Sequence, residues 1–125
     1  MTQNDKQLLI KDLCARLPYD TIISVNNGKY REDVKLHPHY IFDWDAERWD
    51  AKPYFRPMSS MTEEEMSELR QWGCLCMTPD DCVEDVGVYG AIHSIPVIDW
   101  LNAHHFDYRG MIEKGLALPA KEGMY

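Results

Sequence analysis

The tripeptide Asn26-Asn27-Gly28 lies between two segments with strand character and predicts a β-hairpin. Asn-Gly is the strongest short hairpin signal, because both residues tolerate the positive φ angles that a tight turn requires. The segment before it, 21–25, is rich in β-branched residues, which favour strands. We expect the return strand at 29–36, with Tyr30 and Val34 on its inner face. A sheet built on this hairpin is therefore the starting point for the fold.

A first helix is predicted before the hairpin. It ends at Pro18, since the residue preceding a proline avoids the α region. Asn4 or Asp5 is expected to cap its start. Its apolar stripe consists of Leu9, Ile10, Leu13, Cys14 and Leu17. We expect this stripe, including the Cys14 thiol, to pack in the core.

The later elements are predicted from capping and chain-breaking signals. They are a strand at 39–42, an ordered loop with two prolines at 52–61, a helix from Thr62 to Trp72, weak strands at 74–77 and 86–92, a helix from 94 to 104, a short helix at 108–114 capped by Asp107, and an extended tail from about 116. Thr62 and Glu65 form a capping box in this scheme. Strands joined by hairpins, with helices in separate groups, indicate the α+β class: one compact domain over 1–125, with an antiparallel sheet and about four helices.

The composition fits a folded domain that does not bind nucleic acids directly. The chain has 125 residues, 45% of them hydrophobic, and a net charge of -8, which works against binding to phosphate backbones. The acidic residues concentrate at 43–50, 62–70 and 80–85, so one alternative function is an acidic decoy that occupies a nucleic-acid-binding protein. No apolar stretch approaches the ~18 residues of a membrane span, and no signal peptide is visible. We therefore expect a cytoplasmic protein with reduced cysteines.

Cysteine and histidine residues suggest a second alternative, a zinc site. Its candidate ligands are Cys74, Cys76, Cys82 and His93. Zinc prefers such thiolates and imidazoles, but structural zinc sites space their cysteines by two to four residues, and here one residue separates the closest pair. Burial of the cysteines as small apolar side chains is the competing interpretation. His37 and His39, on either side of Pro38, form a weaker candidate pair without a visible third ligand.

No nucleophile–base pair can be assigned, so we expect a binding protein with an unknown protein partner and no cofactor, rather than an enzyme. Aromatic and basic side chains in loops are the best candidates for contacts with the partner, because Trp, Tyr and Arg are favoured at interface hot spots. The candidates are Tyr54, Phe55 and Arg56 in one loop and His105, Tyr108 and Arg109 in another. The competing interpretation is that these side chains seal the core of a small domain.

Four stretches of the chain carry a resemblance. They are 11–19 (KDLCARLPY), 52–65 (KPYFRPMSSMTEEE), 99–118 (DWLNAHHFDYRGMIEKGLAL) and 122–125 (EGMY). Together they are similar to a group of small proteins encoded by gut anaerobic bacteria and by their phages and mobile elements. One departure is Asp20, which stands where we expect glycine after Pro-Tyr. The group has no known activity, so the resemblance implies a compact accessory protein of a mobile element and carries over no catalytic residues.

Overall fold

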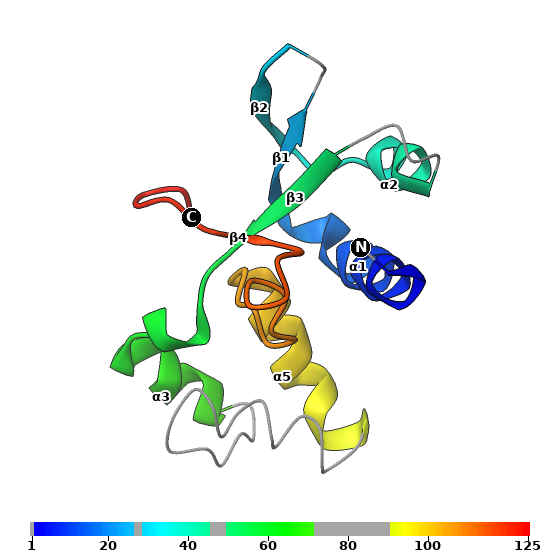
Figure 1. Cartoon of the computed structure of the whole chain (residues 1–125). Coiled ribbons are helices and arrows are strands. Elements are labelled where there is room, and N and C mark those ends of the chain that lie inside the picture. The colour runs from blue at the N-terminus through cyan, green and yellow to red at the C-terminus, as the bar shows by residue number, and fades with distance from the viewer. Residues whose placement is uncertain (1, 27–28, 46–49, 72–90) are drawn as a thin grey trace.

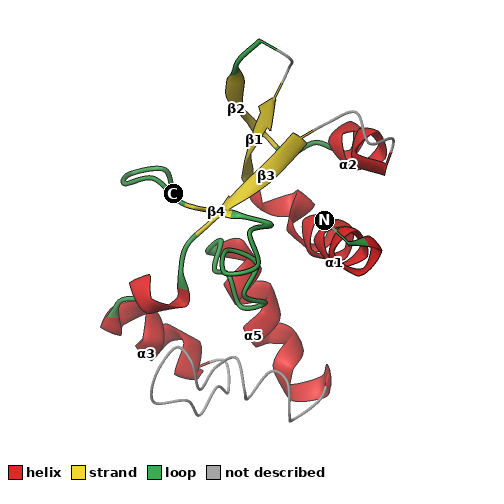
Figure 2. Ribbon diagram, in the orientation of Figure 1, coloured by secondary structure: helices red, strands yellow, loops and turns green. Residues whose placement is uncertain are grey.

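The computed structural model describes residues 2–26, 29–45, 50–71 and 91–125 and has the predicted α+β class (Figure 1). Its elements are α1 (Gln3–Arg16), η1 (Leu17–Tyr19), β1 (Ile22–Asn26), β2 (Arg31–Lys35), α2 (Pro38–Asp45), β3 (Asp50–Phe55), η2 (Met58–Ser60), α3 (Glu63–Gln71), α5 (Ala91–Ala103) and β4 (Leu118–Pro119). Figure 2 shows α1 and α2 beside the strands, while α3 and α5 lie together at the end away from the hairpin.

The strands form one sheet in the order β2-β1-β3-β4. β1 pairs antiparallel with β2 and with β3, which confirms the predicted hairpin; residues 27–28 of its turn lie outside the described part. β4 instead runs parallel to β3, with Leu118 opposite Tyr54. The expectation of a purely antiparallel sheet is therefore wrong for this pair, because the C-terminal segment returns along β3 in the same direction.

The two faces of the sheet differ because side chains alternate along each strand. Ile23 and Val25 of β1 point to one face and are buried. Leu9 and Leu13 of α1 belong to the same hydrophobic cluster, so α1 covers this face. Ser24 points to the opposite face, which carries polar and charged side chains.

Two predictions around β2 are wrong and one is confirmed. Tyr30 is 62% exposed rather than turned inward, because it precedes the first strand residue and lies in the turn. The strand expected at 39–42 is part of the helix α2, which begins at Pro38, a residue whose fixed φ suits the first helical position. Val34 packs against the cluster under α1, as the alternation predicts.

The loop expected at 52–61 is in part a strand. β3 reaches Phe55, and Pro53 lies opposite Ile23 in the ladder with β1. Prolines are usually excluded from such positions because they lack the N–H donor. The Phe55 carbonyl accepts a hydrogen bond from the Ala120 N–H, on the side of the strand away from β1. The nitrogen of Pro53, two residues earlier, faces that same side, so no hydrogen bond between β1 and β3 is lost.

The helix α1 is present as predicted, but its cap and its exposed side differ from the prediction. Thr2 is the N-cap: its hydroxyl accepts from the Asp5 N–H at 3.1 Å, and the Asp5 carboxylate accepts from the Thr2 N–H at 3.2 Å. The prediction of Asn4 or Asp5 as the N-cap is therefore wrong, because the cap lies earlier in the sequence, at Thr2. The thiol of Cys14 is free and exposed, so its expected burial is wrong.

The capping box that opens α3 is confirmed. Thr62 Oγ1 accepts from the Glu65 N–H at 3.1 Å, and Glu65 Oε1 accepts from the Thr62 N–H at 3.0 Å. α5 begins at Ala91, earlier than predicted, and so includes the end of the weak strand expected at 86–92. The strand expected at 74–77 lies outside the described residues. A second hydrophobic cluster involves both helices and consists of Met58, Met61, Met66, Leu69, Val97, Trp100, Leu101, Phe106 and Tyr108.

The short helix expected at 108–114 is a series of turns. Asp107 nevertheless has the predicted capping role, because its carboxylate accepts from the Met111 N–H at 2.8 Å and from the next N–H at 3.0 Å. Leu116 and Ala117 are buried in the cluster under α1. The predicted surface tail therefore begins only after them.

Candidate functional site

The two loops that the sequence singles out are brought together. Arg56 and Phe106 form a parallel β-bridge. The Arg56 N–H donates to the His105 carbonyl at 2.7 Å, and the Asp107 N–H donates to the Arg56 carbonyl at 2.9 Å. Main-chain pairing thus makes these loops neighbours, although they lie far apart in the sequence.

Most of the candidate side chains in these loops are buried. Tyr54, Phe55 and Tyr108 are 6%, 0% and 6% exposed. The Tyr108 hydroxyl donates to Asn102 at 3.0 Å, and the guanidinium of Arg16 lies 3.9 Å from the centre of the Phe55 ring. These positions leave little side-chain surface for a partner, and they favour the competing interpretation of a sealed core.

Arg56 and Arg109 are more exposed, but each pairs with a carboxylate. Arg56 donates to both oxygens of Glu65, at 2.8 and 2.7 Å, and its guanidinium lies 4.1 Å from the centre of the Phe106 ring. These hydrogen bonds from Arg56 hold the pKa of Glu65 below its ordinary value. The Nε atom of Arg109 lies 3.3 Å from the buried carboxylate of Asp12. Both charges are therefore used within the protein.

His105 is held in an unusual conformation and is poorly suited to act as a base near neutral pH. Its φ of 64° lies in the left-handed region, which is uncommon for residues other than glycine. Its ring stacks on Tyr125 with the centroids 3.7 Å apart. Burial, and after it the positive charge of Arg16, lower the pKa of His105 to about 4. Such an imidazole is neutral at pH 7 and accepts protons weakly.

The zinc hypothesis stays a prediction, because three of its four ligands lie outside the described residues. These three are Cys74, Cys76 and Cys82. The fourth, His93, belongs to α5. Within the described part, no group of three or more His, Cys, Asp or Glu side chains could hold a metal ion. His37 and His39 stack with their centroids 5.7 Å apart, but they offer only two ligands.

A site that sequence reasoning largely missed lies on the outer face of the sheet. It is a hollow of about 500 Å³, here called the sheet-face hollow, lined by Ser24, Arg31, Asp33, Lys52, Tyr54, Leu118 and Lys121. Asp33 and Lys52 lie opposite Ser24 on the two neighbouring strands. Arg31 lies two residues before Asp33 on β2, and Tyr54 lies two residues after Lys52 on β3. Because side chains alternate with a period of two, all five point to the same face.

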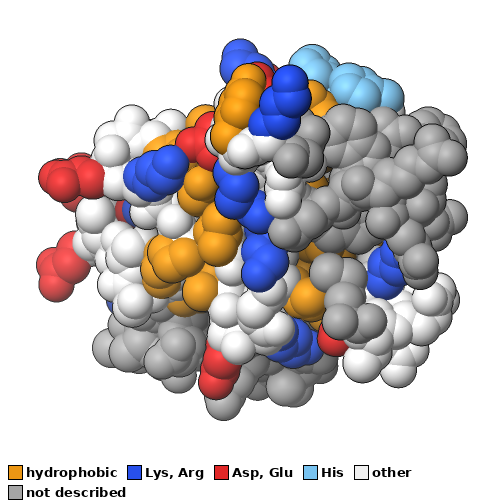
Figure 3. All heavy atoms as spheres, turned by 45° about the horizontal axis from the view of Figure 1, so that its top comes forward, with side chains coloured by type: hydrophobic (Ala, Val, Ile, Leu, Met, Phe, Trp, Pro, Cys, Tyr) orange, Lys and Arg blue, Asp and Glu red, His pale blue; other side chains and the backbone are white. Residues whose placement is uncertain are grey.

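The sheet-face hollow is positively charged although the protein has a net charge of -8. Its lining contains three cations, Arg31, Lys52 and Lys121, and one carboxylate, Asp33. Figure 3 shows Lys and Arg side chains gathered along the middle of one face of the molecule. The charge of the hollow is thus opposite in sign to that of the whole chain.

Hydrogen bonds fix Asp33 and Lys121 at the wall of the hollow. Asp33 accepts from the Lys121 ammonium at 2.8 Å and from the Tyr54 hydroxyl at 2.9 Å. The bond from Lys121, and then that from Tyr54, lower the pKa of Asp33, while bonding to Asp33 raises the pKa of Lys121. Both groups therefore stay charged at neutral pH, and Asp33 positions the Lys121 ammonium.

The other two cations differ in how they are held. Arg31 donates from Nε to the Ser24 hydroxyl at 3.0 Å and from Nη2 to the Ser24 carbonyl at 3.4 Å, so its guanidinium lies over β1. Lys52 has no ion-pair partner among the residues that the structure describes. Its ammonium is therefore the cation of the hollow that an incoming group can engage.

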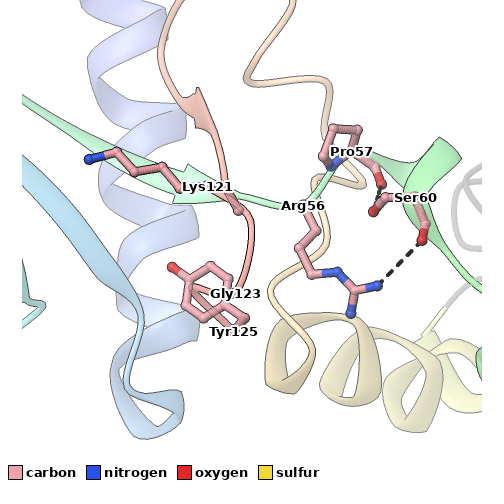
Figure 4. A pocket seen from close by; sticks show the side chains of 7 residues that line it. Arg56, Pro57, Ser60, Lys121, Gly123 and Tyr125 are labelled. Atoms are coloured by element: carbon pink, nitrogen blue, oxygen red, sulfur yellow. Dashed lines mark hydrogen bonds between the residues drawn. The ribbon is translucent and has the colours of Figure 1, made fainter.

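A second hollow, the tail hollow, has a volume of about 300 Å³. Figure 4 shows the side chains that line it. It is lined by Arg56, Pro57, Ser60, Ala120, Lys121, Gly123 and Tyr125. Lys121 lines both hollows, but its side chain points away from Arg56 in the close view (Figure 4). Because Arg56 already pairs with Glu65, the sheet-face hollow is the stronger electrostatic site.

The serines of the two hollows are hydrogen-bonded to groups other than a catalytic base. Ser24 accepts from Arg31, and Ser60 donates to the Pro57 carbonyl at 2.6 Å, so neither serine is paired with a base. No family model, curated protein or solved structure matches the chain. None of the described helices is both long and apolar enough to cross a membrane. Function is therefore inferred from the site itself.

Proposed function

We propose that this protein is a small non-enzymatic binding protein and that its ligand occupies the sheet-face hollow. The observation that carries the proposal is the ammonium of Lys52, which lines the hollow and has no ion-pair partner among the described residues. A negatively charged group of a ligand would supply the partner that this ammonium lacks, through a charge-assisted hydrogen bond.

The framework around the hollow supports this proposal. Ser24 and Tyr54 come from the two central strands, and both are nearly buried. Binding groups on strands are held more accurately than those on loops, and a site formed before binding loses less conformational entropy when the ligand arrives. The cluster under α1 fixes the same strands from the other face.

The size of the hollow favours a small molecule over the protein partner that the sequence suggests. Small-molecule sites commonly have volumes of roughly 300–1,000 Å³, and the sheet-face hollow has about 500 Å³. Loop side chains suited to protein contacts, such as Phe55 and Tyr108, are buried instead.

Native mass spectrometry of the protein after incubation with a cell extract tests the proposal. We expect a small-molecule adduct on the unmodified chain and its loss in Lys52→Met, which keeps the length of the side chain and removes its charge. Lys11→Met is the matched control, because it removes the same charge from an exposed position of α1. A bare chain mass throughout, or an adduct that survives Lys52→Met, would contradict the proposal.

A further inference from the structure

We infer that residues 121–125 form a strap that docks on the sheet as one unit and carries Lys121 into and out of the wall of the sheet-face hollow, with Tyr125 as its latch. This inference rests on the proposed function and concerns the regulation of the same site.

The latch is the hydroxyl of Tyr125, which continues the pairing of β1 with β3. The recorded pairing of these strands ends at Ile23 and Pro53. Ile22 and Tyr54 occupy the next position, and the hydroxyl bridges them: it accepts from the Ile22 N–H at 2.9 Å and donates to the Tyr54 carbonyl at 2.8 Å. Burial raises the pKa of Tyr125 to about 12, so this donor keeps its proton at neutral pH. A docked strap is therefore joined to both central strands.

The second anchor of the strap is Lys121, whose ammonium donates to Asp33 of β2 at 2.8 Å. The chain turns back between the two anchors, because the Met124 N–H donates to the Lys121 carbonyl at 3.1 Å and Gly123 has a φ of 76°, which glycine adopts readily. The side chains of Lys121 and Tyr125 extend to the same side of this turn (Figure 4). Two anchors on one short turn are expected to dock and to leave together.

The strap is attached by few contacts. Its main chain follows Ala120, whose N–H donates to the Phe55 carbonyl at 2.8 Å. Within the described part of the chain, the hydrogen bonds that link 121–125 to other segments come from the two anchor side chains. The partners of the second anchor's ion pair are 61% and 36% exposed, and ion pairs so exposed contribute little to stability. Segments held in this way open more readily than the core does.

Movement of the strap changes the sheet-face hollow. The docked strap places Lys121 in its lining, where the bond to Asp33 holds the ammonium. Release removes this wall and also frees the carbonyl of Tyr54, whose side chain lines the hollow. A ligand that touches Lys121 therefore favours the docked strap, and docking raises the affinity for the ligand by the same factor.

Amide hydrogen exchange of the full chain tests whether the anchors act together. In Lys121→Met, the Ile22 amide, which bonds to the latch and not to Lys121, should exchange about threefold faster, because loss of an exposed ion pair shifts the docking equilibrium by that order. The Val25 amide within the same strand should exchange at an unchanged rate, which separates strap release from global destabilisation. Lys11→Met, the matched loss of an exposed charge, should alter neither amide.

A carboxyl NMR titration provides the reciprocal measurement. The bond from Lys121 lowers the pKa of Asp33, so this pKa should rise in Tyr125→Ala, where the strap is released although Lys121 is retained. It should not change in Lys11→Met. An unchanged pKa of Asp33 in Tyr125→Ala, or an unchanged exchange rate of the Ile22 amide in Lys121→Met, would show that the two contacts are independent and would overturn the inference.

Native mass spectrometry separates this inference from the proposed function. Tyr125→Ala should carry less of the small-molecule adduct than the unmodified chain. An adduct that is lost in Lys52→Met but is undiminished in Tyr125→Ala would overturn control by the strap and leave the proposed function standing. If both coupling measurements succeed and no chain carries an adduct, the proposed function fails and the strap stands.

Discussion

The Nε atom of Arg16 lies 2.9 Å from Oδ2 of Asp12, and both side chains are fully buried. Arg16 also donates from Nη2 to the Phe106 carbonyl at 2.7 Å, and its guanidinium lies over the ring of Phe55. Arg109 approaches the other oxygen of Asp12. This buried network joins α1 to β3 and to the loop after α5, so it stabilises the framework on which the sheet-face hollow is built.

Replacing Arg16 with methionine should therefore destabilise the protein strongly. Removal of one partner of a buried ion pair commonly costs about 3–5 kcal/mol, because the other charge is left buried. Burial already raises the pKa of Asp12, and loss of Arg16 removes the attraction that opposes this rise. Urea denaturation measures the change in free energy of unfolding, and the exposed Lys11→Met variant is the control. A loss below about 1 kcal/mol, as for an exposed ion pair, would contradict this account of the network.

His105 should make stability depend on pH below neutrality. The pKa of His105 is lowered from 6.5 to about 4 in the folded protein. As the pH falls from 6.5 to 4, the unfolded chain binds a proton that the folded chain does not, so stability declines, by about 2 kcal/mol. His105→Asn removes this titration and keeps a residue that tolerates a positive φ. Urea denaturation at pH 7 and pH 4.5 should show a smaller decline for the variant; equal declines would refute the assignment.

Tyr125 should hold the tail against the sheet through its hydroxyl. That oxygen accepts from the Ile22 N–H at 2.9 Å and donates to the Tyr54 carbonyl at 2.8 Å. Tyr125→Phe loses both hydrogen bonds and retains the ring that stacks on His105, so we expect a loss of about 1 kcal/mol. Tyr125→Ala also loses the stack and should lose more. If the two variants are equally stable in thermal unfolding, the stack contributes nothing.

The capping box of α3 gives a further prediction. Thr62→Ala removes the hydroxyl that accepts from the Glu65 N–H and should cost about 1 kcal/mol. Ser67→Ala, at an exposed position within the same helix, is the matched control and should be neutral or slightly stabilising. Chemical denaturation of both variants provides the comparison. Similar stabilities would show that water replaces the cap at no cost.

The features that the sequence predicts correctly depend on local signals. The hairpin follows from the backbone freedom of Asn27-Gly28 and the β-branched residues before it. The box formed by Thr62 and Glu65 is likewise local, and so is the capping role of Asp107. Each of these signals acts within a few residues, so distant contacts do not override it.

The features that the sequence misses depend on contacts between distant segments. The sequence does not reveal β3, because Pro53 suggests a loop. Only the pairing of β3 with β1 and β4 shows that the missing N–H of Pro53 removes no hydrogen bond between strands. Once β3 is known, alternation places Lys52 beside Tyr54 on the outer face. Lys121 has no local signal at all, because the parallel pairing of the C-terminal segment and the hydrogen bond to Asp33 bring it to the site.

A crystal structure of the protein incubated with a cell extract before crystallisation would locate the ligand directly. We predict a bound small molecule in the sheet-face hollow, within hydrogen-bond distance of Lys52 Nζ. An empty sheet-face hollow, with a small molecule bound elsewhere or not at all, would contradict the assignment of this face as the binding site.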